Sequence, residues 1–359
     1  MSQPSLIRQT HNDADTCVFE MSCANSYYAY PNLLELEAIP GNVKGTLEFL
    51  WRRSVHEGRK VRILQFFDVF VAKEGLVFDR DFNLIPETRT YHNDGEVNEG
   101  LEKVRSFALS GDGASIDRCI LGKSRGATNY GHFILEMLPR AWVARRHLRV
   151  DDWPVLIHRA SADLVRTASQ ALNAIGVPDD KIVLTGEEPI FVKQLIFVDG
   201  LTQHSYYLSP FVFQCLDEIS ANIQADADKK IYASRGANSS RNFHEENVAA
   251  RKLIELGYNE KFSGALDFQS QIKMFKGADR IVGVMGAALT NIAFCNPGTA
   301  IFCFMPNTAS EVLFWMIAQA RRLDYREIRC TEVGPQTGSL PWDRSIQIDP
   351  DRLARIVSA

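Results

Sequence analysis

Apolar and polar positions follow two different patterns along the chain, and the change comes near residue 117. Before it, an apolar, β-rich run at 62–71, a turn at 73–75 and a second run at 76–78 predict a β-hairpin. Residues 45–55 predict a short helix. The rest of the first 60 residues fits no single period, so we expect only a β-rich start there.

From residue 117 onward, strand-like runs alternate with amphipathic helical segments. Gly176 and Pro178 mark the end of one predicted helix, and Asp267 is a plausible cap for another. Alternation of this kind predicts a parallel sheet covered by helices. The predicted strands are 119–121, 155–158, 182–184, 191–198, 230–234, 280–284 and 300–304, and the helices 130–147, 162–175, 210–223, 245–256, 268–276, 311–322 and 349–357.

The alternation occurs twice, which predicts an α/β protein with two Rossmann-like domains facing each other across a cleft. A length of 359 residues agrees with two domains. We expect an N-terminal domain over 1–190, with its β-rich extension, and a C-terminal domain over 191–335. The tail, 336–359, ends in a helix that could pack back on the N-terminal domain.

Amino-acid composition and net charge limit which partners and which cellular compartment we expect for the protein. Hydrophobic residues make up 45% and charged residues 23%, as in ordinary globular proteins, and a net charge of −4 gives no support for a nucleic-acid partner. The seven cysteines form no CxxC pair and have no histidine at metal-ligand spacing, which indicates a reducing compartment and no zinc. No apolar run reaches membrane-spanning length, so we expect a cytoplasmic protein, with peripheral membrane attachment as an alternative. Its oligomeric state is left open.

The segment 279–304 combines a strand, a turn of small residues, a short amphipathic stretch and a second strand. The turn contains Gly286, Ala287 and Ala288, which would let a ligand approach free backbone N–H groups. Nucleotide phosphates or a ribose are the usual ligands of such a turn. The alternative is that the small residues only allow the helix to pack on the sheet.

A second candidate lies at the start of the helix predicted over 130–147. His132 and Glu136 are four residues apart, so they share one side of the helix, and Asn129 stands just before it. A histidine with a carboxylate one turn away can act as a general base with an orienting partner. The alternative is a histidine that caps or packs the helix start, beside a solvated glutamate.

Two arginines form the third candidate. Arg235 follows a predicted strand directly, at the end of the sheet where open α/β proteins bind ligands, and Arg241 follows on a polar loop. Two guanidinium groups can bind a diphosphate and neutralise its charge, although both could instead be ordinary surface side chains. Gln271, on the helix before the glycine turn, could face the same ligand. No dinucleotide fingerprint, P-loop, hydrolase elbow or D-x-D metal motif accompanies them.

Three blocks in this order resemble glycosyltransferase family 61, and the resemblance covers about residues 117–305. That family includes capsule and exopolysaccharide enzymes. The first block is an asparagine, then a histidine opening a helix that runs to Leu-Pro-Arg; the second is a strand ending in Ser-Arg with a second arginine; the third is a Gln-containing helix before a Gly-Ala turn. The matching residues are Asn129, His132, Glu136, Leu138-Pro139-Arg140, Tyr232-Ala233-Ser234-Arg235, Arg241-Asn242, Glu245-Glu246, Gln271, Phe275, Ala278, Val282-Gly283 and Gly286–Asn291.

The resemblance implies a GT-B architecture, with the acceptor on the N-terminal domain and a nucleotide-sugar donor, first of all a UDP-sugar, on the C-terminal domain. It implies an inverting transfer without an obligatory metal or other cofactor. The acceptor would be a glycan, a lipid-linked sugar or a small molecule. His132 would be the base, with Glu136 as second choice, although His132 could bind a phosphate or the sugar instead. Arg235 and Arg241 would meet the diphosphate, while Thr290 and Asn291 could bind ribose or base.

Two positions depart from the family pattern. The family usually has histidine where this chain has Met285, and Ala288 stands where glycine is more usual, which is a milder change. Two hypotheses follow from the change at Met285. The first is an active glycosyltransferase, with a modified donor site. The second is a non-catalytic relative that binds a nucleotide or glycan within a polysaccharide assembly system.

Overall fold

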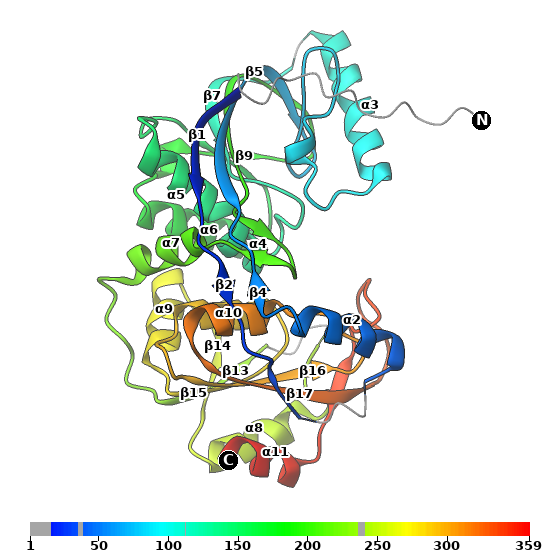
Figure 1. Ribbon diagram of the computed structural model, residues 1–359, viewed down its shortest axis with the longest axis vertical. Coiled ribbons are helices and arrows are strands. Elements are labelled where there is room, and N and C mark those ends of the chain that lie inside the picture. The colour runs from blue at the N-terminus through cyan, green and yellow to red at the C-terminus, as the bar shows by residue number, and fades with distance from the viewer. Residues whose placement is uncertain (1–15, 35–38, 112, 236–240) are drawn as a thin grey trace, which may run out of the picture. The chain divides into compact units, whose positions relative to one another are not determined.

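The computed structural model describes residues 16–34, 39–111, 113–235 and 241–359, and these form two compact units (Figure 1). The first unit contains the chain up to Cys23 together with Arg59–Thr202. The second unit contains Ala24–Gly58 and Gln203–Ala359. The described residues of 24–58 therefore belong with the C-terminal half of the chain, and the helix predicted over 45–55 is confirmed there as α2, a few residues earlier.

The first unit is built on a seven-stranded mixed sheet with the order β1-β5-β10-β7-β8-β9, and β6 pairs with β5. β10, β7, β8 and β9 are parallel, while β5 is antiparallel to β10 and β1 is antiparallel to β5. The predicted hairpin is confirmed, because Phe70 of β5 pairs with Phe78 of β6. The strands are β1 (Cys17–Ser22), β5 (Lys60–Ala72), β6 (Leu76–Phe78), β7 (Ser115–Leu121), β8 (Val155–His158), β9 (Ile182–Thr185) and β10 (Ile190–Asp199).

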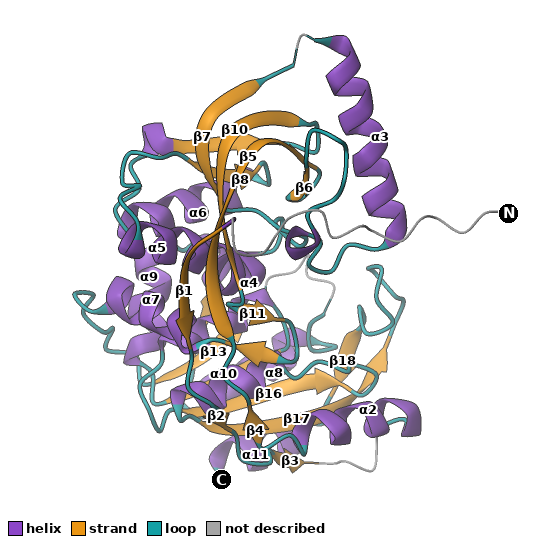
Figure 2. Cartoon of the chain, turned by 45° about the horizontal axis from the view of Figure 1, so that its top comes forward, coloured by secondary structure: helices purple, strands orange, loops and turns teal. Residues whose placement is uncertain are grey.

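Helices of the first unit lie against this sheet, and three of them, α3, α4 and α6, begin at a polar cap. Helix α3 (Asp94–Ser110) begins with a capping box between Asn93 and Glu96, and it appears as one unbroken helix in Figure 2. The sequence pattern had not predicted α3, because only Gly100 and Val104 along its length are buried. The other helical segments are η2 (Pro86–Thr88), α4 (Tyr130–His132), the π turn η3 (Phe133–Met137), α5 (Leu138–His147), α6 (Ala162–Ala174) and η4 (Asp179–Lys181).

The second unit is a doubly wound sheet. Its strands run in the order β14-β13-β15-β16-β17-β18, with β3 pairing to β17. The first five are mutually parallel, and numbering them by chain position gives the order 2-1-3-4-5 of flavodoxin-like folds. The strands are β13 (Lys230–Ser234), β14 (Asn259–Phe262), β15 (Arg280–Val284), β16 (Ala300–Pro306), β17 (Asp324–Val333), β18 (Ser345–Gln347) and β3 (Asn32–Leu34), and a separate ribbon joins β2 (Ser26–Tyr27) to β4 (Val55–His56).

Helices cover both faces of this second sheet. α8 and α11 share one face with a core that contains Tyr232, Leu253, Phe302 and Leu353, and α9 and α10 lie on the other face (Figure 1). The C-terminal helix packs against α8 within the second unit. The helical segments are α2 (Gly41–Trp51), α7 (Pro210–Ser220), α8 (Glu246–Glu255), η5 (Ser263–Ala265), α9 (Phe268–Gly277), η6 (Ala287–Phe294), α10 (Leu313–Arg321) and α11 (Pro350–Ser358).

The predicted strands and helices after residue 117 are confirmed to within a few residues, with two local corrections. The stretch after the small-residue turn is the 3₁₀ helix η6, not an amphipathic α-helix. The helix predicted over 130–147 is interrupted by the π turn η3. The β-rich start is not a separate extension, since β1, β5 and β6 complete the sheet of the first unit. The roles expected for ranges 1–190, 191–335 and 336–359 remain predictions.

Candidate functional site

Topology alone locates the best ligand site in the second unit. In a doubly wound sheet, ligands bind beyond the carboxyl ends of the strands, where neighbouring connections leave in opposite directions. With the order 2-1-3-4-5, this switch point lies between β13 and β15. β13 leads directly into Arg235, and β15 leads directly into Met285 and Gly286. Four residues that the sequence analysis discussed therefore lie at this switch point or in the loop beside it. They are Arg235, Arg241, Met285 and Gly286.

The Arg235 guanidinium lies against the backbone of the glycine turn. Its Nη1 donates a hydrogen bond to the carbonyl oxygen of Met285. A Cβ placed on Gly286 would come 1.4 Å from the same Nη1 and 2.3 Å from Cζ. Because Gly286 has an extended backbone with φ 166°, close approach and not backbone strain is the reason for glycine here. The side chain of Met285 is 2% exposed, so at this position the chain uses its backbone carbonyl to hold the arginine.

Gly286→Ala is predicted to displace the Arg235 guanidinium and to weaken binding of a nucleoside diphosphate at least about tenfold, the loss of roughly one charge-assisted hydrogen bond. The measurement is calorimetric titration of the two proteins with UDP, beside a thermal unfolding curve of each. Gly45→Ala is the matched control, because a Cβ there meets nothing within 4 Å. Equal UDP affinity in the Gly286→Ala protein would contradict the assigned contact.

Arg235 and Arg241 form the cationic part of the site. Burial lowers the pKa of Arg235 to about 10, and the nearby positive charge of Arg241 contributes to the lowering. Burial also lowers the pKa of Arg241, while the negative charges of Asp343 and Glu311 oppose that change. Nε of Arg241 lies 3.5 Å from Oδ1 of Asp343. Arg235 is therefore charged at neutral pH, and the two guanidinium groups stand near enough to interact electrostatically. Residues 236–240, which include the polar residues Asn238, Ser239 and Ser240, lie outside the described residues.

The remaining donor-side candidates of the second unit divide into two groups. Ala287 and Ala288 are half-buried in the first turn of η6, where a 3₁₀ helix leaves its first N–H groups without an intrahelical acceptor. Thr290 and Asn291 are buried, with exposures of 1% and 0%. Asn291 Nδ2 donates to Gln271 Oε1 at 2.9 Å and to the Ala288 carbonyl at 3.2 Å. Gln271 and Asn291 thus stabilise the turn through these hydrogen bonds. Their direct contact with a donor remains a prediction.

In the first unit, the predicted histidine–glutamate pair is formed. His132 Nδ1 and Glu136 Oε1 lie 2.8 Å apart, with side-chain exposures of 25% and 6%. Asn129 caps the helix, because its Oδ1 accepts from the N–H of Gly131 at 2.8 Å. Gly126 makes room for the imidazole: its φ is +87°, and a Cβ there would lie 2.8 Å from His132 Cδ2. When Nδ1 donates to Glu136, Nε2 carries the lone pair that can accept a proton.

The π turn and a buried arginine support this pair. η3 begins at Phe133, directly after His132, and single π turns are frequently found at functional sites. Arg140 lies over the ring of Phe197 at 4.9 Å, and burial lowers its pKa while the charge of Glu136 opposes the change. The helix that carries these residues follows the carboxyl end of β7, where ligand sites occur in parallel sheets.

Three residues near the switch point were not identified from the sequence. Glu311, before α10, accepts from His204 Nε2 at 2.8 Å and from Ser205 Oγ at 3.1 Å, and also from the N–H groups of Val312 and Leu313. Its charge reaches Arg241. Position after the carboxyl end of β16 was the only available signal for Glu311, since its histidine partner is 107 residues away in sequence.

The Glu311 carboxylate predicts an acid-sensitive contribution to stability. Burial alone would raise its pKa, but the charge and hydrogen bond of His204, together with the N–H of Leu313, lower the pKa to about 2 from an ordinary value of 4.5. A lowered folded-state pKa stabilises the protein fully above about pH 5, and this stabilisation is lost as the pH falls towards 2. Urea unfolding of wild-type and Glu311→Gln protein should therefore differ most at pH 7 and converge at lower pH. A difference that is constant between pH 7 and 3 would contradict this assignment.

The protein is an α/β protein. In its second unit, the Arg235 and Arg241 guanidinium groups lie at the switch point of the sheet, or in the loop beside it. The family follows from comparison with known proteins: the family model Glycosyltransferase 61 matches residues 130–302. Over these residues, just under half of the chain, the sequence matches glycosyltransferase family 61, which confirms the predicted resemblance. The family assigns glycosyltransferase as the class of activity and implies a nucleotide-sugar donor and a glycan acceptor. No curated protein matches the chain. Among the described residues, every helix is too short or too polar to cross a membrane.

Proposed function

We propose that the protein transfers a sugar from a nucleotide-sugar donor, first of all a UDP-sugar, to a hydroxyl group of a glycan, with inversion and without an obligatory metal. The observation that carries the proposal is the Arg235 guanidinium, held against Gly286 at the switch point of a doubly wound unit. That position is where such folds bind nucleotides. The family match supports the reaction class.

The second unit supplies what the leaving group needs. As the bond between the sugar and the diphosphate breaks, negative charge develops on the diphosphate oxygen. Arg235 and Arg241 would neutralise this charge from fixed positions, as a divalent cation does in other transferases. The N–H groups of the first turn of η6, at Ala287 and Ala288, would add about 0.3–2 kcal/mol. Asn291 and Gln271 would act by holding that turn in place.

The first unit would supply the base. His132 Nε2 accepts the proton of the acceptor hydroxyl while the hydroxyl oxygen attacks the anomeric carbon from the face opposite the diphosphate. Glu136 keeps Nδ1 in the donating tautomer and stabilises the imidazolium that forms. One bond forms and one breaks, so the configuration inverts and the proton stays on His132 until water removes it. This assignment requires a GT-B arrangement, with donor on the second unit and acceptor on the first.

A specific observation favours one other function. Met285 replaces the usual histidine of the family, and its side chain is buried instead of being presented to a ligand. A protein that binds a nucleotide or a glycan within a polysaccharide assembly system, without turnover, would show the same arginine site. Turnover separates the two functions, because both predict binding.

The test is a panel of nucleotide sugars assayed with the purified full-length chain. UDP-, GDP-, CMP- and TDP-sugars are incubated with a mixture of oligosaccharide acceptors, and released nucleotide and new glycosides are measured. A thermal shift by one nucleoside diphosphate with glycoside formation supports the enzyme. A shift with no turnover across the panel supports the binding protein. Absence of any shift with all four nucleotides would exclude the enzyme and a nucleotide-binding relative, and would leave only a glycan-binding protein.

A further inference from the structure

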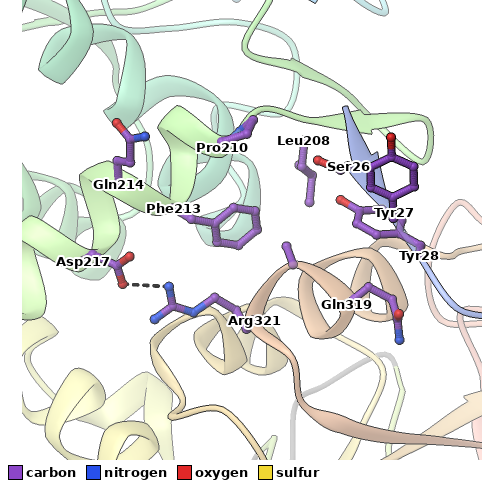
Figure 3. Close-up of a pocket in the computed structure, with 11 residues that line it drawn as sticks. Ser26, Tyr27, Tyr28, Leu208, Pro210, Phe213, Gln214, Asp217, Gln319 and Arg321 are labelled. Atoms are coloured by element: carbon purple, nitrogen blue, oxygen red, sulfur yellow. Dashed lines mark hydrogen bonds and ion pairs between the residues drawn. The ribbon is translucent and has the colours of Figure 1, made fainter. Parts of the chain in front are cut away.

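A cavity of about 330 Å³ opens in the second unit at a place that the proposed transfer does not use (Figure 3). It lies among β2, α7 and the last turn of α10. α10 follows the carboxyl end of β16 and ends at Arg321, just before β17 begins, so its last turn is at the amino edge of the sheet. The switch point with Arg235 is at the opposite, carboxyl edge. The cavity is therefore a separate site, of a volume usual for small-molecule pockets, about 300–1,000 Å³.

Aromatic rings form one wall of the cavity. Tyr27 exposes 73% of its surface although its strand pairs with β4. The neighbouring Tyr28 is buried and fixed, with ring centroids 4.3 Å from His56 and 5.6 Å from Trp315. Phe213 contributes a third ring from α7. This wall is a preformed apolar surface with one ring left open to a ligand.

Polar side chains line the cavity together with these rings. Arg321 Nη1 donates to Asp217 Oδ1 at 2.6 Å, and the Asp217 side chain is 55% exposed. Gln214 is another lining residue on α7. Gln319 Oε1 accepts from the N–H of Ala29 at 2.8 Å, which fixes the orientation of this amide and leaves its NH₂ group as the donor end. The cavity thus offers a carboxylate, a guanidinium and amides, and the carboxylate and guanidinium lie side by side.

We propose that this cavity binds a pyranose unit of a glycan. A pyranose has flat C–H faces, which suit aromatic rings, and hydroxyl pairs, which donate to Asp217 and accept from Arg321 or Gln319. A wholly apolar ligand would desolvate the Asp217–Arg321 ion pair without replacing its water. An anion would be repelled by the Asp217 carboxylate, and a cation would be repelled by the Arg321 guanidinium. A neutral polyhydroxylated ring is the ligand class that can both stack on the aromatic rings and form hydrogen bonds with the charged groups.

The inference rests on the proposed function in one respect. The bound glycan would be the acceptor chain, and the cavity would hold a sugar residue of that chain distant from the reacting hydroxyl. Binding remote from the reaction raises the local concentration of the reacting end without any new contact at the chemistry. We therefore expect longer acceptors to have lower KM values than the monosaccharide. Nucleotide binding at Arg235 does not depend on the cavity, so the two proposals fail separately.

The experiment uses the full-length chain and an immobilised array of pyranose oligosaccharides of two to six units. Tyr27→Ala is the variant, since its exposed ring is not needed for the core, and the loss of one aromatic contact predicts about tenfold weaker binding to the glycan that wild-type binds best. Asp217→Asn should weaken binding of the same glycan. Phe49→Ala is the matched control, because Phe49 is 64% exposed in the same segment and does not line the cavity.

Two results would overturn the proposal: wild-type protein that binds no oligosaccharide on the array, or Tyr27→Ala protein that binds as tightly as wild-type. The thermal shift by UDP is measured on the same samples. An unchanged UDP shift in Tyr27→Ala with weakened glycan binding supports a separate glycan site. A glycan signal that disappears equally in Phe49→Ala contradicts it.

Discussion

Arg235→Ala is expected to lower kcat/KM for transfer by roughly 100- to 1,000-fold, the usual loss when one preorganised donor to developing negative charge is removed. The guanidinium is charged at neutral pH, since burial and Arg241 lower its pKa only to about 10. It is also held in a fixed position by the Met285 carbonyl. The same variant should lose the thermal shift by UDP.

Two further variants separate charge from geometry. Arg235→Lys keeps a positive charge but loses the planar fork, so we expect an intermediate activity. Arg251→Ala, on an exposed position of α8, is the control and should behave as wild-type. Urea unfolding of each protein shows whether a loss reflects folding, because Arg235 lies mostly inside the unit. Full UDP binding by a folded Arg235→Ala protein would refute the donor assignment.

His132→Gln is expected to lower kcat by about 100- to 10,000-fold, the range for a lost general base, and to leave the KM for the donor nearly unchanged. Glu136→Gln should produce a smaller loss in kcat, because the imidazole remains while its orienting carboxylate is gone. Initial rates are measured over a donor concentration series at several pH values.

The pattern of the kinetic constants distinguishes the alternatives for His132. If the imidazole binds a donor phosphate, KM for the donor should rise and kcat should change little. His147→Gln is the control, since His147 lies at the end of α5 and stacks on Phe19 with centroids 4.7 Å apart. Equal losses in His132→Gln and His147→Gln would indicate damage to the first unit and would remove His132 from the mechanism.

Much of this fold could be predicted where local signals agreed. After residue 117, apolar periodicity, capping residues and glycines point to the same elements, and β13, β15, β16 and α9 follow the expected ranges closely. The His132–Glu136 contact also followed from helical spacing. The switch point could be anticipated in part, because Arg235 and Gly286 each follow a predicted strand.

Other features depend on contacts between distant parts of the chain and left no local signal. The Glu311–His204 pair joins residues 107 apart, and Asp343 reaches Arg241 from beyond β17. The π turn after His132 contains ordinary helix-forming residues, so its extra residue per turn is set by packing. Helix α3 was missed because most of its surface is polar, and β3 because its partner strand β17 comes late in the chain.

That last connection constrains how the protein is made. Ala29 bonds to Gln319 across a separation of 290 residues, and β3 adds to β17. The second unit is thus interrupted in sequence by Arg59–Thr202 of the first, and its earliest segment leaves the ribosome long before its partner strands exist. Leu47, Leu50 and Trp51 must stay unaggregated through this interval. The first unit can form before β17 is synthesised, whereas completion of the second waits for β17 and β18, so separately expressed halves would each lack part of a core.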